Sequence, residues 1–174
     1  MIQELQKICE ENDCSLKQTD LKELGPGSSR THISKYNLQI FQNGTVIDSI
    51  FDFGKTDSAK FIIELEPLNR ISEFELTSFE HLRKLILFRK QNWELKPEHG
   101  SLRFDVEKLL AKHGLINLME KTAFQPEMSG KLRNRKYRIE TMFSLKYDGN
   151  IQSIKPIVDF HKELVDLIKL KYCS

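Results

Sequence analysis

The chain has 174 residues, of which 39% are hydrophobic and 30% charged, and its formal net charge is +2. This composition is typical of a globular protein and excludes a disordered chain, and the small net charge argues against a dedicated nucleic-acid-binding domain, which is usually far more basic. The length predicts one domain over residues 1–174. The charged N-terminal segment and the lack of a long apolar run predict a cytoplasmic protein with no membrane contact.

The cysteines and histidines show no metal-binding pattern. Three cysteines, Cys9, Cys14 and Cys173, are an odd number at spacings that match neither a zinc site nor a thioredoxin motif. We expect all three to be free thiols, which fits a reducing compartment. The five histidines are far apart in the chain, so we predict neither a metal site nor a cofactor.

The N-terminal segment predicts two helical pieces and a loop. Residues 2–9 place their apolar side chains on one helical stripe. The stretch "TDLKELG", residues 19–25, predicts a short helical turn that ends at glycine. The stretch "GPGSSRTH", residues 25–32, combines residues that favour turns and predicts an exposed loop.

A hairpin and further strands are predicted next. Apolar residues alternate over 33–41, the Asn43-Gly44 pair is favoured in tight hairpin turns, and 46–53 returns as the second strand. The alternation in 60–66 predicts a third strand, with a short helix capped by Ser58 as the alternative.

The middle of the chain predicts a strand, helices and a loop. Residues 72–77 favour a fourth strand, and 78–91 favour a helix. Residues 104–124 predict one or two helices, broken or bent at Gly114. The stretch "QPEMSGK", residues 125–131, predicts a loop.

The period of the apolar residues switches to two at Lys136, which predicts a long half-buried strand. Its buried face carries Tyr137, Ile139, Phe143, Leu145 and Tyr147. An amphipathic helix with Pro156 near its first turn closes the chain. Its inner face carries Ile157, Phe160, His161, Leu164, Val165 and Ile168. We expect His161 to be hydrogen-bonded and half-buried.

These elements predict an α+β fold, because strands joined by a tight hairpin are followed by runs of helices rather than by regular βαβ alternation. We expect a mainly antiparallel sheet, formed by the N-terminal hairpin and the long C-terminal strand. Several helices, including the amphipathic C-terminal helix, pack against this sheet.

The stretch "FDFGKTDSAKF", residues 51–61, contains the tripeptides DFG and GKT. A phosphate-binding loop needs a glycine where this chain has Ser49, and kinase use of DFG needs a catalytic loop that this chain lacks. We therefore expect Gly54 to end a strand and residues 55–57 to form a polar turn.

Three carboxylates offer the only enzymatic alternative that we found. Asp52 lies near the end of one predicted strand, and Glu64 and Glu66 share one face of the next. If these strands pair so that the three carboxylates meet, the chain could be a metal-dependent phosphodiester hydrolase. A solvated strand face is the other interpretation, and it is the one we favour.

The charge distribution is uneven, and it directs attention to one basic segment. Residues 1–66 carry a net charge of −4, and residues 131–174 carry +5. The segment "KLRNRKYR", residues 131–138, contributes Lys131, Arg133, Arg135, Lys136 and Arg138 with no acidic residue among them. Because Tyr137 faces the core, Lys136, Arg138 and Lys146 are expected to face solvent, with Arg133 and Arg135 on the approach loop. Arg83, Lys84, Arg89 and Lys90 of the predicted helix could extend this surface.

Three interpretations of the basic segment follow. It could protect an edge strand from aggregation, bind a nucleic acid, or contact an acidic protein surface. The sequence therefore predicts a non-catalytic cytoplasmic binding or regulatory protein that uses residues 131–138 against a nucleic acid or an acidic protein partner. The metal-dependent hydrolase with Asp52, Glu64 and Glu66 is the alternative.

Overall fold

The computed structural model describes most of the chain, namely residues 2–12, 14–24, 30–54, 56–67, 70–79, 91–97 and 100–173. Most of the helix predicted at 78–91 lies outside these residues, and so do residues 25–29 of the predicted loop. The strands and helices that carry the rest of the argument are all described.

One sheet of eight strands organises the fold, in the order β1-β2-β3-β4-β8-β7-β5-β6. The strands are β1 (Cys14–Leu24), β2 (Arg30–Gln42), β3 (Thr45–Phe53), β4 (Ser58–Leu65), β5 (Phe74–Ser78), β6 (Trp93–Lys96), β7 (Glu127–Arg133) and β8 (Lys136–Ser144). Neighbouring strands pair antiparallel. The prediction of an α+β fold with a mainly antiparallel sheet is confirmed.

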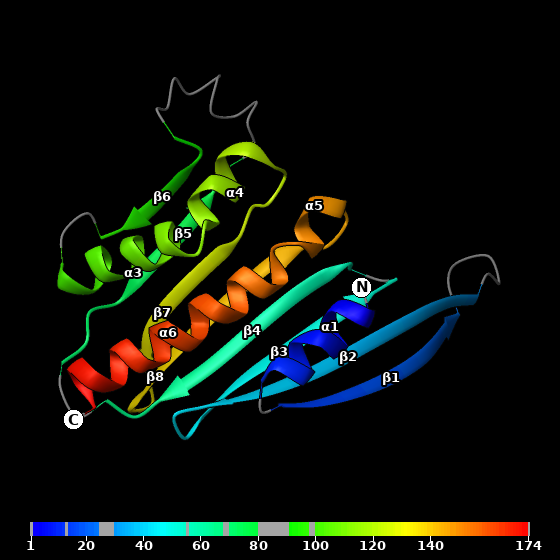
Figure 1. The fold of residues 1–174 in the computed structure, drawn as a ribbon, viewed down its shortest axis with the longest axis horizontal. Helices are drawn as coiled ribbons and strands as arrows, with labels where there is room; N and C mark the ends of the chain where they lie inside the picture. The colour runs from blue at the N-terminus through cyan, green and yellow to red at the C-terminus, as the bar shows by residue number, and fades with distance from the viewer. Residues whose placement is uncertain are drawn as a thin grey trace.

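The helices pack against one face of this sheet (Figure 1). The described helices are α1 (Ile2–Glu11), α3 (Ser101–Lys112), α4 (Leu115–Lys121), α5 (Asp148–Ile151) and α6 (Ile154–Tyr172). Gly114, with φ of 70°, lies between α3 and α4 and separates them, as the sequence predicted. The opposite face of the sheet, which we call the open face, carries the polar side chains of the strands.

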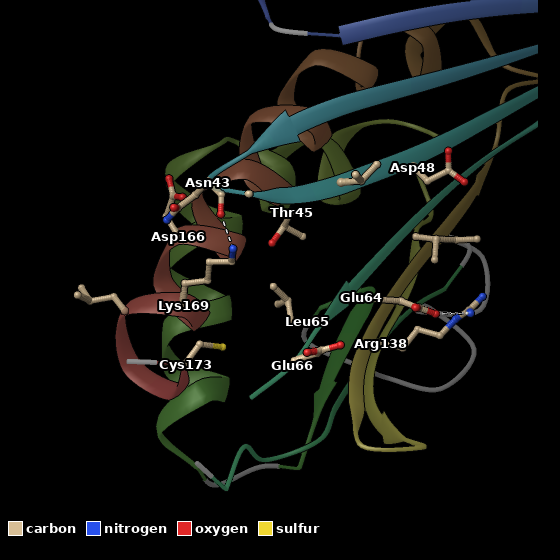
Figure 2. Close-up of a pocket in the computed structure, with 14 residues that line it drawn as sticks. Asn43, Thr45, Asp48, Glu64, Leu65, Glu66, Arg138, Asp166, Lys169 and Cys173 are labelled. Atoms are coloured by element: carbon tan, nitrogen blue, oxygen red, sulfur yellow. Dashed lines mark hydrogen bonds and ion pairs between the residues drawn. The ribbon is translucent and has the colours of Figure 1, made fainter. Parts of the chain in front are cut away.

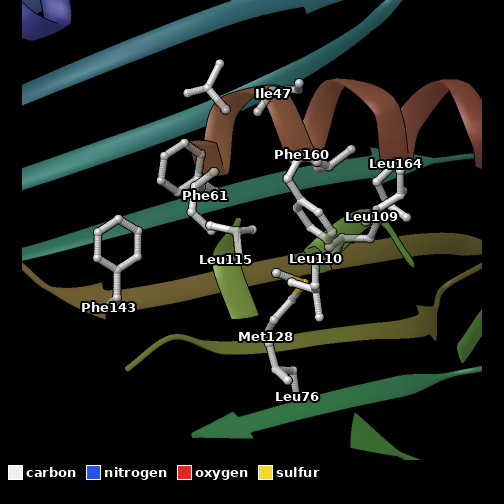
Figure 3. Packing of buried hydrophobic residues seen from close by; sticks show 14 of the residues in the cluster. Ile47, Phe61, Leu76, Leu109, Leu110, Leu115, Met128, Phe143, Phe160 and Leu164 are labelled. Carbon is white, nitrogen blue, oxygen red and sulfur yellow. The ribbon is translucent and has the colours of Figure 1, made fainter. Parts of the chain in front are cut away.

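The core lies between the helices and the helix-facing side of the sheet. Along β4, Phe61, Ile63 and Leu65 are buried, whereas Glu64 between them is exposed. Figure 3 shows Phe61 of the sheet on the side that faces Phe160 and Leu164 of α6, and the Phe61 ring stacks on that of His161 in the same helix. Each such side chain contributes about 1.5–3 kcal/mol through the apolar surface that it removes from water.

Helix α6 buries one side against the sheet. Its buried residues include Ile157, Phe160, His161, Leu164, Val165 and Ile168. Tyr147, by contrast, is 57% exposed, which corrects its assignment to the buried face of β8. The strand ends at Ser144, so the alternation that buries Tyr137 no longer applies three residues further on.

Two segments form strands, although the sequence predicted a helical turn for one and a loop for the other. Residues 19–24 do not form a helical turn but continue β1, whose pairing with β2 runs without a break from Cys14 opposite Ile40 to Leu24 opposite Arg30. Residues 127–131 do not form a loop but belong to β7. In both cases pairing with a neighbouring strand outweighs the local preference of the residues.

The prediction of three free thiols is wrong, because Cys9 and Cys14 form a disulfide. The end of α1 and the start of β1 bring their Cα atoms to 5.3 Å, a separation that a disulfide can span. Cys173 is the free thiol. The cytoplasmic location stays a prediction, without the support that free thiols gave it.

Among the helices in the described part of the chain, none combines the length and the apolar character needed to cross a membrane.

Candidate functional site

The basic segment forms the β7–β8 hairpin. Strand β7 ends at Arg133, residues 134–135 make the turn, and β8 begins at Lys136. The register places Arg133 opposite Lys136 and Lys131 opposite Arg138. Like charges directly across a strand pair repel each other, so this hairpin depends on carboxylates supplied by its neighbours.

Glu64 of β4 and Glu140 of β8 supply two of these carboxylates. Arg138 donates from Nη1 to Glu64 Oε1 at 3.0 Å and from Nη2 to Glu140 Oε1 at 2.6 Å. Lys136 Nζ lies 3.4 Å from Glu64 Oε2. The hydrogen bond from Arg138, helped by the charge of Lys60, lowers the pKa of Glu140 below its ordinary value, although desolvation opposes the shift. Two of the predicted free cations are therefore neutralised.

Lys131 is also paired, since its Nζ lies 3.6 Å from Glu75 Oε2 of β5. The strand order shows that β8 is not an edge strand, because β8 lies between β4 and β7 and the sheet ends at β1 and β6. The interpretation of the segment as protection of an exposed edge is therefore wrong.

The remaining cations of the segment lie at what we call the hairpin tip, residues Leu132–Lys136. Arg133 and Arg135 are exposed, and neither has an ion-pair partner among the described residues. Leu132 beside them is 52% exposed. A hollow of about 450 Å³ lies next to the tip, and its walls are formed by Glu64, Arg133, Asn134, Lys136 and Arg138.

The tip has an unusual backbone. Asn134 and Arg135 have φ of 50° and 66°, the left-handed region in which glycine or asparagine is normally found. An arginine in this conformation costs about 1–2 kcal/mol relative to a right-handed one. Residues in strained backbone conformations often mark functional positions, and this one presents a guanidinium at the outermost point of the hairpin.

Lys146, another of the predicted basic residues, does not join the tip. Lys146 follows the opposite end of β8, and the strand from Lys136 to Ser144 alone spans roughly 25 Å at the usual rise per residue. Arg83 and Arg89, with Lys84 and Lys90, lie outside the described residues. Among the described residues, the tip is therefore a smaller basic surface than the sequence predicted.

The three carboxylates of the hydrolase alternative do not meet. In the β3–β4 register Asp52 lies opposite Ser58, and Glu64 lies beyond Ile63 at the other end, roughly 20 Å away. Asp52 pairs with Lys35 at 3.6 Å, whereas Glu64 pairs with Arg138. Glu66 stays near Glu64, but no three His, Cys, Asp or Glu side chains of the described chain are placed to hold a metal ion.

The DFG tripeptide ends β3, as expected, and Gly54, Thr56 and Asp57 lie between β3 and β4, whereas Lys55 lies outside the described residues. The backbone N–H of Gly54 donates to Asp57 Oδ1 at 2.9 Å, and that of Thr56 donates to Asp52 Oδ1 at 3.3 Å. Gly54 has φ of 99°, so it ends the strand in a conformation that other residues avoid. These polar groups stabilise a turn.

His161 is fully buried rather than half-buried. Its Nε2 lies 2.8 Å from Thr141 Oγ1, and its ring stacks on Phe61 with centroids 5.0 Å apart. Burial lowers the pKa of His161 to about 3, so the imidazole is neutral at ordinary pH. A neutral ring sealed between α6 and β8 serves packing and has no access to a substrate.

Sequence reasoning missed a larger hollow of about 1140 Å³ beside the C-terminal end of α6 (Figure 2). It lies between the Asn43-Gly44 turn, the end of β4 and α6. Glu64 and Glu66, which the sequence analysis considered only as metal ligands, belong to its lining. No local pattern could reveal it, because its walls come from four separate segments.

Comparison of the chain with protein-family models, curated proteins and solved structures found no match. The function is therefore argued from the geometry of the chain itself.

Proposed function

We propose that the protein is a non-catalytic binding or regulatory protein whose hairpin tip contacts an acidic surface of a partner protein. The observation that carries this proposal is the pair Arg133 and Arg135, both exposed and without ion-pair partners among the described residues. The other three cations of the segment are held by Glu64, Glu75 and Glu140. Within residues 131–138, only the tip therefore presents uncompensated positive charge.

The chemistry of the tip favours carboxylates. A guanidinium is planar and can take both oxygens of a carboxylate, and it loses less hydration on binding than a lysine ammonium does. The exposed Leu132 adds an apolar contact beside the two arginines. A charged rim around an apolar contact is a usual arrangement in protein–protein interfaces.

A protein partner is favoured over a nucleic acid for two reasons. Nucleic-acid binding draws its affinity from several phosphate contacts, whereas most cations here are already paired with carboxylates of neighbouring strands. Those carboxylates also lie close to any phosphate backbone laid along the hairpin and would repel it. Stacking of bases is not supported either, because Tyr137, the aromatic residue of the segment, is fully buried.

The test is binding measured by fluorescence anisotropy across a salt series. The probes are a labelled peptide in which glutamate alternates with leucine, a labelled duplex DNA and a labelled single strand. Wild type is compared with Arg133→Ala/Arg135→Ala. The matched control is Lys108→Ala/Lys121→Ala, which removes the same charge from exposed positions of α3 and α4.

We expect wild type to bind the acidic peptide, the tip variant to lose at least about tenfold in affinity, and the control to bind like wild type, since charge-assisted hydrogen bonds are made only at the tip. An equal loss of affinity in the tip variant and in the control would show that net charge alone explains the binding, and it would overturn the proposal. Preferential binding of the duplex, with a salt slope that flattens in the tip variant, would replace the protein partner by a nucleic acid.

A further inference from the structure

The two edge strands of the sheet differ in length. Strand β6 has four residues, whereas β1 has eleven. An edge strand exposes unpaired backbone N–H and C=O groups, and proteins usually protect such an edge by keeping it short or by placing a proline or a bulge in it. Strand β1 contains no proline, and its pairing with β2 runs from Cys14 to Leu24 without a bulge. Another strand can therefore pair with β1 along its whole length.

The outer edge of β1 faces away from the rest of the described chain. Figure 1 shows β1 at the margin of the molecule, and among the described strands it pairs with β2 alone. Ser15 and residues 17–20 are all exposed, so side chains on both faces of the middle of the strand contact solvent. Helix α1 contacts β1 near the disulfide of Cys9 and Cys14, at the start of the strand. The backbone groups along the outer edge are therefore accessible to a partner strand.

The far end of β1 belongs to a two-stranded arm. Residues 21–24 pair with residues 30–33 of β2, but the pairing of β2 with β3 begins only at Ser34 opposite Phe53. We call residues 21–24 and 30–33 the arm. A ribbon of two strands is only marginally stable in water, and a third strand stabilises it. Within the described chain, no third strand pairs with the arm.

The sequence of β1 is compatible with pairing to a copy of itself. Thr19 is the central residue of the strand, so an antiparallel pairing of two copies over the whole strand places Thr19 opposite Thr19 and Gln18 opposite Asp20. A threonine pair across two strands is favourable, and an amide can donate to a carboxylate. Lys17 falls opposite the uncharged position 21, and no position of this register brings two residues of like charge opposite each other. The charges of β1 therefore do not oppose a second copy.

We propose that β1 is a homodimer interface, in which the β1 strands of two copies of the chain pair antiparallel with Thr19 on the two-fold axis. In this register residues 21–24 of each copy pair with residues 14–17 of the other. Residues 14–17 are supported by their own sheet, because they lie opposite residues 37–40 of β2, which in turn pair with β3. Each arm thus gains a third strand that belongs to a complete sheet. A second copy is the partner that supports both arms at once.

The proposed dimer is closed and separate from the hairpin tip. The two-fold axis uses the β1 edge of both copies, so only the short β6 edges remain and the assembly stops at two chains. The hairpin tip belongs to β7 and β8, which are separated from β1 by β2, β3 and β4. The interface therefore does not depend on the function proposed for the tip, and both tips of the dimer lie outside it.

The test is sedimentation-velocity ultracentrifugation of the full chain over a range of about 1–200 µM. Wild type is compared with Thr19→Asp, with Thr19→Lys and with an equimolar mixture of the two, because each variant alone places two like charges opposite each other on the two-fold axis. The controls Asn117→Asp and Asn117→Lys introduce the same charges at an exposed position of α4. Circular dichroism checks that each variant is folded, and hydrogen exchange of residues 14–20 at both ends of the concentration range locates the interface.

We expect wild type to form a dimer of twice 20.4 kDa with a Kd below about 50 µM, and the backbone amides of β1 to exchange more slowly at the higher concentration. Each Thr19 variant alone should raise the Kd at least about tenfold, whereas the mixture should form a heterodimer within about threefold of the wild-type affinity, because opposite charges then meet on the axis. The proposal is overturned by a wild type that stays monomeric up to about 200 µM, or by a folded Thr19→Asp that dimerises like Asn117→Asp. A mixture that associates no better than its separate components would also overturn it.

Discussion

Two hairpins of this sheet have nearly the same turn and different reasons for forming it. The β2–β3 hairpin turns at Asn43 and Gly44 with φ of 49° and 69°, and the β7–β8 hairpin turns at Asn134 and Arg135 with φ of 50° and 66°. Asparagine followed by glycine prefers this turn without help. Asparagine followed by arginine does not, so the second hairpin must be stabilised from elsewhere.

The stabilisation of the second hairpin comes from its neighbours. Gly130 of β7 lets Phe74 and Tyr137 pack directly against the backbone, and the Tyr137 hydroxyl donates to the backbone oxygen of Ser72 at 2.8 Å. Glu64 and Glu75 neutralise its cations from either side. The first hairpin is therefore specified by local sequence, and the second by contacts with distant strands.

Among the changes that test this comparison, Gly130→Ala should cause the largest loss in the free energy of unfolding. A methyl group at this position overlaps the ring of Phe74 and the hydroxyl of Tyr137, and both side chains are buried. We expect a loss of about 3 kcal/mol in the free energy of unfolding, measured by urea denaturation, as for overpacked cores. Ser129→Ala, on the open face of the same strand, is the control. A loss below about 0.5 kcal/mol would show that the hairpin does not depend on this packing.

Acidification should give the second largest loss in the free energy of unfolding, because His161 is buried between β8 and α6. Burial lowers the pKa of His161 from 6.5 to about 3, so on acidification the unfolded chain binds the proton first. The stability that this group contributes is complete above pH 6.5 and is lost as the pH falls toward 3. Between pH 7 and pH 5 the loss is about 2 kcal/mol.

The matched variant is Thr141→Val/His161→Leu, which removes the buried pair. Its unfolding free energy, measured across the same pH range, should fall about 2 kcal/mol less than that of wild type. An identical pH dependence in the two proteins would contradict the burial of a neutral imidazole.

Exchange of the turn residues tests the comparison directly. Arg135→Gly should stabilise the chain by about 1 kcal/mol, because glycine adopts a positive φ without strain. Gly44→Arg should destabilise it by about 1–2 kcal/mol for the same reason. Thermal unfolding of both variants gives the answer, and a destabilising Arg135→Gly would mean that the arginine side chain contributes more than its backbone conformation costs.

Glu64→Gln should have the smallest effect. The ion pairs that it breaks with Lys136 and Arg138 are partly exposed, so we expect a loss of about 0.5 kcal/mol, smaller still in high salt. Thr45→Ser in the first hairpin is a suitable reference for a mild change. A salt-independent loss of more than about 2 kcal/mol would indicate that these charges stabilise the second hairpin far more than packing does.

The sequence predicted those parts of the fold in which neighbours along the chain carry the signal. The Asn43-Gly44 turn, the break at Gly114 and the alternation of Phe61, Ile63 and Leu65 are all present. The prediction from sequence failed where pairing with a distant strand determines the secondary structure. Residues 19–24 pair with β2, and residues 127–131 pair with β5 and β8.

The candidate site was predictable only in part, for the same reason. The sequence placed Arg133 and Arg135 on a loop, whereas Arg133 ends strand β7 and Arg135 lies in the turn. It could not show that Glu64, 74 positions from Arg138, pairs with both Arg138 and Lys136. It named Glu64 and Glu66 without the hollow that they line. The register between β3 and β4, which cannot be read from either segment alone, places Asp52 far from Glu64 and Glu66.

By itself, the sequence determined the α+β class, the first hairpin and the position of the basic segment, because periodicity, turn chemistry and charge are properties of consecutive residues. The tertiary structure alone decided that β8 lies inside the sheet, that Cys9 and Cys14 are joined, and that, of the cations in residues 131–138, only Arg133 and Arg135 stay without an ion-pair partner in the described chain. Each of these depends on which segments meet in space, and contacts between distant residues are selected by packing of the whole sheet rather than by local preference.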